Sequence, residues 1–179
     1  MIKISSIDEF ISELDNTKPA DYAKVVKALD LDPKLFKRYA TWKESCYTRN
    51  CLGKTADYEL ILLCWDEGAE TPIHGHGGED CWVYQLSGTV EEIRYRELEE
   101  NVLEASHKLC LQPGKLTYMN DDMGYHSIRN IGAGRAMTLH IYASPISFCK
   151  VYNEESNDFA IKELFYHTYK GEPFQVSKA

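Results

Sequence analysis

The chain has 179 residues, 44% of them hydrophobic and 27% charged, and its formal net charge is -8 at pH 7. These values predict a single globular domain over residues 1–179, with enough apolar residues for a sizeable core. The negative charge disfavours nucleic acid and anionic membranes as partners. No apolar run reaches the roughly 18 residues of a membrane span, and the opening MIKISSIDEF lacks the apolar stretch of a signal peptide. The six cysteines contain no CxxC pair, which favours free thiols in a reducing cytoplasm.

Residues 1–40 carry three helical patterns. Ser6 followed by Glu9 is a capping-box signature ahead of an apolar stripe. The stretch PADYAKVVKALD spaces its apolar residues at helical intervals, and an Asp-Pro pair then predicts a short helix that ends at Tyr39. We therefore expect a helical N-terminal segment.

Residues 41–179 change to β-branched and aromatic runs separated by turn residues. Many short strands at this spacing predict a sandwich or a barrel, and the late stretch DFAIKELFYHTY fits a strand or a helix equally well. The expected fold is therefore mainly β, preceded by helices, and nothing in the chain requires more than a monomer. The predicted strands are YELILLCW, CWVYQL, TVEEIRYREL, KLTYMN, HSIRN, AMTLHIYA and SFCKVY.

His74 and His76 form a His-x-His pair in the stretch TPIHGHGGEDCWVYQLSG. Because strand side chains alternate faces, both imidazoles can point toward one site. His126 begins a later predicted strand after an acidic turn, where a third ligand would be needed. Three imidazoles are a suitable ligand set for a transition metal, so these residues are the candidate metal site. We expect His107, which lies in the polar EASHKL, and the near-terminal His167 to be surface residues.

The same stretch resembles the first conserved motif of the cupin family. Gly68, His74, His76 and Gly88 fall in register with that motif, and Cys81 stands where most cupins have a metal-binding glutamate. A degraded second motif follows, in which Gly114, His126 and Asn130 are present but the proline is missing. The resemblance implies a cupin, or jelly-roll, β-barrel with three histidine ligands and no carboxylate.

Separated blocks in the same order then resemble cysteine dioxygenase over about residues 45–150. The blocks are CYTRN, ILLCW, MNDDMGYHSIRN and TLHIYASP. The resemblance implies that Fe(II) is held by His74, His76 and His126, and that O2 and the sulfur of L-cysteine react there to give cysteine sulfinate. Neutral imidazoles would leave the positive charge of the iron uncompensated, which favours an anionic thiolate.

The resemblance also assigns the pocket residues. Arg49 would bind the substrate carboxylate with its guanidinium fork, and Tyr47 would line the same pocket. His140 and Tyr142 are i, i+2 on one predicted strand, so they should share the interior face with Thr138, and His140 would orient the tyrosine rather than bind metal. Without the resemblance, Arg49 would be interpreted as a surface salt-bridge residue, and the buried tyrosine and histidine as purely structural.

Cys81 and Tyr142 match the two residues that animal-type cysteine dioxygenases join by a thioether bond. We therefore expect that a Cys81–Tyr142 crosslink can form in this chain, although an unmodified buried cysteine beside a tyrosine remains an alternative. The resemblance further suggests a cis bond between Ser144 and Pro145, against a base rate of about 5% for such bonds.

Three alternative functions remain open at this stage. A related enzyme class oxidises 3-mercaptopropionate, and a non-catalytic cupin would bind metal or a small ligand. A zinc or manganese isomerase would need a carboxylate ligand, for which Glu79 is the candidate.

Overall fold

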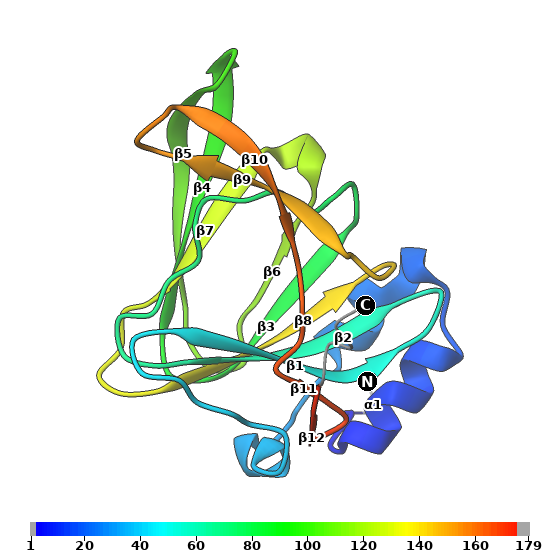
Figure 1. The fold of residues 1–179 in the computed structure, drawn as a ribbon. Coiled ribbons are helices and arrows are strands. Elements are labelled where there is room, and N and C mark those ends of the chain that lie inside the picture. The colour runs from blue at the N-terminus through cyan, green and yellow to red at the C-terminus, as the bar shows by residue number, and fades with distance from the viewer. Residues whose placement is uncertain (1–2, 175–179) are drawn as a thin grey trace.

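The computed structural model describes residues 3–174, and its α-helices lie only near the N-terminus (Figure 1). Ser6 accepts a hydrogen bond from the backbone of Glu9 and so caps the first helix, while the Glu9 carboxylate accepts from Ser5. The helix predicted to end at Tyr39 is instead a shorter 3-10 turn that begins after the capping residue Asp32. The helical elements are α1 (Ile7–Asp15), η1 (Pro19–Asp21), α2 (Tyr22–Lys27), η2 (Pro33–Phe36) and η3 (Asp121–Met123).

A seven-stranded sheet forms one layer, in the order β12-β11-β1-β2-β8-β3-β6. The central strands β2, β8 and β3 pair antiparallel and are buried along almost their whole length. The strands are β1 (Tyr47–Lys54), β2 (Glu59–Trp65), β3 (Cys81–Ser87), β6 (Leu116–Met119), β8 (Ala136–Tyr142), β11 (Thr168–Tyr169) and β12 (Glu172–Pro173).

The facing layer combines a three-stranded sheet, β5-β4-β7, with the two-stranded pair β9-β10. The irregular segment 70–76 lies between them, since His74 bridges to His126 on β7 and to Val151 on β9. This segment therefore joins the two small sheets into one layer. Its strands are β4 (Val90–Glu99), β5 (Val102–Leu111), β7 (Tyr125–Asn130), β9 (Phe148–Asn153) and β10 (Asp158–Glu163).

The large sheet buries a different set of residues on each face. Along β2, Leu60 and Leu62 join a cluster that packs against α1 and α2, whereas Ile61 and Leu63 join a cluster between the two β layers. This alternation follows from the two-residue period of a strand, and it explains why β2 is an uninterrupted apolar run in the sequence. The helices thus cover the outer face of the large sheet, and its inner face is directed toward the second β layer (Figure 1).

Three details differ from the sequence-based expectation or complete it. Within residues 3–174 the hydrogen-bonded ladders leave edges and do not close into a barrel. The Ser144–Pro145 bond is trans, so the suggested cis bond is wrong and the commoner isomer of X–Pro holds. The stretch that fitted a strand or a helix forms β10 and β11.

None of the helices in the described residues is long and apolar enough to cross a membrane.

Candidate metal centre and adjoining cavity

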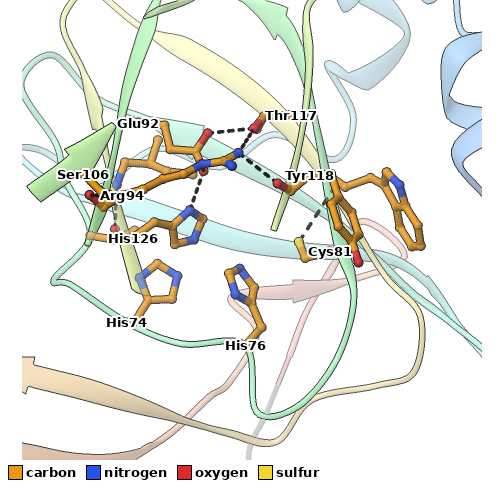
Figure 2. A network of polar contacts seen from close by, with 12 residues as sticks. His74, His76, Cys81, Glu92, Arg94, Ser106, Thr117, Tyr118 and His126 are labelled. Atoms are coloured by element: carbon orange, nitrogen blue, oxygen red, sulfur yellow. Dashed lines mark hydrogen bonds and ion pairs between the residues drawn. The ribbon is translucent and has the colours of Figure 1, made fainter. Parts of the chain in front are cut away.

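His74, His76 and His126 come together between the two layers, and one ring nitrogen of each lies within 4.8 Å of the others. The ring centroids of His74 and His126 are 4.6 Å apart, as are those of His76 and His126. Figure 2 shows the three imidazole rings around one point. The structure therefore brings together the three histidines that the sequence nominated.

Backbone pairing sets the positions of these rings. His74 and His126 exchange two backbone hydrogen bonds of 2.9 and 3.0 Å, so segment 70–76 is fixed against β7. Asp121 then holds the following turn, because its carboxylate accepts from the backbone N–H groups of His76 and Gly78. The His-x-His pair thus lies in an anchored loop segment rather than in a named strand.

Burial keeps the three imidazoles neutral. It lowers the pKa of His74, and it lowers the pKa of His76 and His126 well below the usual histidine range, with a further contribution from the neighbouring histidines. Both ring nitrogens of His76 are buried without a hydrogen-bond partner. Buried polar atoms normally have partners, and a neutral imidazole is the form that binds metal. The donor set therefore fits a divalent transition metal ion.

In His74 and His126, the ring nitrogen Nδ1 lies close to an oxygen atom, which leaves Nε2 as the possible metal-binding atom. His74 Nδ1 is 2.9 Å from the carbonyl of Pro72, and His126 Nδ1 is 2.9 Å from a carboxylate oxygen of Glu92. Such contacts fix ring orientation and tautomer in metal sites. Sequence reasoning missed Glu92, although its position two residues after buried Val90 in a predicted strand is a usable signal.

A small cavity of about 30 Å³ lies beside the three histidines and is lined in part by His74. Tyr47, Arg49, His140 and Tyr142, all nominated from the sequence, line it as well. Two further lining residues, Cys149 and Lys162, face each other across β9 and β10 and were not foreseen. The cavity is therefore small and lined by two cationic side chains, those of buried Arg49 and exposed Lys162.

Arg49 is buried, with 8% of its surface exposed, and its Nε and Nη2 atoms have no hydrogen-bond partner. The Glu59 carboxylate is 3.9 Å from Nη2, which is too long for a hydrogen bond, and its other oxygen accepts from the Tyr166 hydroxyl. Burial raises the pKa of Glu59, and the Arg49 charge opposes that rise. The guanidinium therefore retains donors for an anionic group.

A hydrogen-bonded row runs along the interior face of β8 toward the cavity. Trp65 Nε1 donates to Thr138 Oγ1 over 2.9 Å, and Thr138 Oγ1 is 2.9 Å from His140 Nε2. The ring centroids of His140 and Tyr142 then lie 6.5 Å apart in a stacked arrangement. Sequence alternation thus predicted which side chains share this face.

Cys81 lies directly opposite Tyr142 in the antiparallel pairing of β3 with β8, and its thiol is fully buried. Burial raises the pKa of Cys81, which a hydrogen bond with Tyr142 partly offsets. Burial and the Cys81 charge raise the pKa of Tyr142 well above its usual value. The two side chains are thus buried neighbours on adjacent strands.

The remaining candidates lie elsewhere. Glu79 is not part of the histidine cluster, which removes the carboxylate ligand that an isomerase would require. His107 is exposed on β5, as expected. His167 is only partly buried, and its Nδ1 accepts from the backbone of Arg49 over 3.1 Å.

Comparison with known proteins identifies the family of the chain. The family model described as cysteine dioxygenase type I matches residues 4–155. The chain belongs to this family. Cysteine dioxygenase type 1 of Homo sapiens is 25% identical over 161 residues, covering 88% of this chain and 80% of the human protein. That of Danio rerio is 25% identical over 176 residues, covering 93% and 87% respectively.

Solved structures confirm the cupin fold class. The TT1209 protein of Thermus thermophilus has a TM-score of 0.50 and 24% identity, covering 61% of this chain and 93% of its own. A conserved Klebsiella pneumoniae protein with a double-stranded β-helix domain also has a TM-score of 0.50, at 16% identity, covering 70% and 92%. At these identities the likeness concerns the fold alone.

Proposed function

We propose that this cysteine dioxygenase family member oxidises L-cysteine with O2 to cysteine sulfinate at an Fe(II) ion held by His74, His76 and His126. The observation that carries the proposal is a cluster of three neutral imidazoles beside a small cavity into which a buried, incompletely bonded Arg49 projects. The bound iron would supply the one-electron chemistry that lets O2 react with a thiol. A cytoplasmic location fits the six free thiols of the chain.

The side chains of the cavity have separate roles in this proposal. Arg49 binds the substrate carboxylate, because its free donors match a carboxylate and its charge is poorly compensated. Tyr47 and Tyr142 line the cavity and limit the room around the substrate. Trp65 and Thr138 fix His140, which packs against the Tyr142 ring and orients its hydroxyl. Holding both reactants in one small space provides the orientation effect.

A second candidate substrate is 3-mercaptopropionate, and Lys162 is the observation that favours it. Lys162 lines the cavity together with Arg49, so two cations face a substrate that carries one carboxylate. A thiol without an ammonium group would experience no repulsion from Lys162. Cysteine remains the first candidate because of the family and because Cys81 and Tyr142 are paired.

Oxygen uptake with three thiols tests the proposal. Protein reconstituted with Fe(II) would be given cysteine, 3-mercaptopropionate or cysteamine, with ¹⁸O2 as the oxidant and mass spectrometry of the product. We expect cysteine to be the best substrate, and its sulfinate to carry two labelled oxygen atoms. The His126→Ala protein should lose activity and bound iron, whereas His107→Ala should keep both. An iron-loaded wild-type protein that consumes no O2 with any thiol would be a non-catalytic metal-binding cupin.

A further inference from the structure

A buried polar network adjoins His126 (Figure 2), and Glu92, Arg94 and Thr117 are not among the residues that line the cavity. Glu92 and Arg94 reach it from β4, and Thr117 reaches it from β6 on the facing layer. The Glu92 side chain is fully buried, and that of Arg94 is 15% exposed. The network meets the histidine cluster at the contact between Glu92 and His126.

The Glu92 carboxylate has a partner on each oxygen. Oε1 is 2.9 Å from His126 Nδ1 and accepts from Arg94 Nε over 3.3 Å, while Oε2 accepts from Thr117 Oγ1 over 2.8 Å. Arg94 Nη2 also donates to Thr117 Oγ1 over 2.7 Å and to the Tyr118 carbonyl over 2.9 Å. An ionised carboxylate only accepts hydrogen bonds, and the groups around Glu92 are arranged as donors to it. Both its orientation and its charge are therefore well defined.

The three histidines differ in the groups that their ring nitrogens contact. His126 meets a carboxylate that is itself paired with an arginine, whereas His74 meets the neutral Pro72 carbonyl. His76 has no partner on either ring nitrogen, and its nearest carboxylate oxygen, on Asp121, is 3.9 Å away. Negative charge is thus delivered to the cluster mainly through His126. A cluster with three neutral ligands consequently has one ligand whose basicity is raised by an anion.

We propose that Glu92 and Arg94 are a pair of positioning residues with opposite electrostatic effects on the metal centre. Glu92 holds the proton of His126 on Nδ1, leaves Nε2 for the metal, and stabilises the oxidised ion with its charge. Arg94 fixes the carboxylate and offsets part of that charge. The proposal rests on the metal assignment made above, and it adds the residues that set the redox potential of that metal.

Matched substitutions separate this role from a purely structural one. Glu92→Gln keeps the shape and an acceptor oxygen but removes the negative charge, so the Fe(III)/Fe(II) midpoint potential should rise. Arg94→Gln removes the compensating positive charge, so the potential should fall. Glu91→Gln is the control, since Glu91 is the adjacent residue on β4 and its carboxylate pairs with the exposed Lys108 at 2.8 Å. Loss of packing alone would not move the potential in opposite directions in the first two variants.

The measurements are a potentiometric titration of the iron-loaded protein without substrate and a competition titration of Fe(II) affinity against a chelator. We expect Glu92→Gln to weaken Fe(II) binding about 10- to 100-fold, as for other partners of metal-bound histidines, and Glu91→Gln to change neither quantity. Midpoint potentials that stay unchanged, or that move in the same direction in both variants, would overturn this inference. In that case the proposed function would still stand if the wild-type protein oxidises cysteine. A wild-type chain that binds no iron would overturn both.

Discussion

At the scale of single residues, the cavity contains an arginine that lacks hydrogen-bond acceptors for two of its nitrogens. Arg49 is buried beside Glu59 at 3.9 Å, and two of its nitrogens lack partners. An unpaired donor in a dry site costs free energy, so the structure retains Arg49 at a cost to stability. A substrate carboxylate would supply the missing acceptors, which is why Arg49 is better explained by binding than by folding.

Replacing Arg49 by alanine should therefore discriminate between thiols. We expect kcat/KM for cysteine to fall by roughly 30- to several-thousand-fold, because losing a buried charge-assisted pair costs about 2–5 kcal/mol. Use of cysteamine, which lacks the carboxylate, should change much less. Steady-state oxygen uptake with both thiols measures this ratio, and Arg129→Ala is the control because Arg129 is exposed in its pair with Glu70. Equal losses with both thiols would contradict a carboxylate-binding role.

The second residue-scale prediction concerns Cys81 and Tyr142. Their opposed positions on β3 and β8, in a fully buried environment, favour a thioether after aerobic turnover with iron. The bond would form with loss of two hydrogen atoms to O2, so mass spectrometry should find a chain lighter by that amount, with peptides that stay joined under reducing agents. Cys81→Gly should stay partly active, since the crosslink limits ring motion and does not perform the reaction. A fully separable pair after turnover would contradict the crosslink.

At the scale of elements, the sequence predicted the seven strands β2, β3, β4, β6, β7, β8 and β9, which alternate or are bounded by turn residues, but it missed β1 and β5. It could not predict that segment 70–76 joins two small sheets, because that pairing depends on β7 and β9, which lie far along the chain. The sequence did predict that His140 and Tyr142 share a face, because alternation along one strand is a local property. It did not predict the contact of Glu92 with His126, because these residues lie on different strands. Local periodicity is visible in a sequence, whereas contacts between distant strands are not.

The turn before β4 offers a test of backbone geometry. Gly88 and Gly68 have nearly equal positive φ angles, 73° and 72°, but a Cβ on Gly88 would lie 2.6 Å from that of Ala136, whereas Gly68 has nothing within 4 Å. Gly68→Ala should cost about 1–2 kcal/mol of unfolding free energy, for the left-handed backbone alone. Gly88→Ala should cost about 1–3 kcal/mol more, through the clash with β8. Urea unfolding of both variants measures the difference, and equal costs would show that β8 moves aside easily.

At the scale of the whole molecule, the two layers enclose a set of histidines that are kept from their usual protonation. Burial lowers the pKa of His74, and lowers that of His76, His126 and His140 well below the ordinary value. The apolar cluster between the two β layers, to which Ile61 and Leu63 of β2 belong, contributes to this burial. These four histidines are therefore folded in the neutral form, which acid disfavours and which the metal requires of its ligands.

The stability of the metal-free protein should consequently fall as the pH falls below about 6.5. A histidine whose pKa is lowered in the folded state takes up protons mainly in the unfolded chain, so its stabilising contribution is present above the unfolded pKa and is lost below it. Between pH 7.5 and 5.5 each such histidine should cost about 1.4 kcal/mol of unfolding free energy. His140→Gln should reduce the pH dependence by about one histidine's share, because His140 is buried and lies outside the metal cluster.

Urea unfolding of chelator-treated protein at the two pH values measures this effect, with His107→Gln as the control because His107 is exposed. The control variant should retain the full pH dependence of the wild type. Iron-loaded protein should lose still more stability toward acid, since protons compete with the metal for the ligand nitrogens. A metal-free protein equally stable at both pH values would mean that the histidines become protonated inside the fold, which would remove the basis for treating them as preformed neutral ligands.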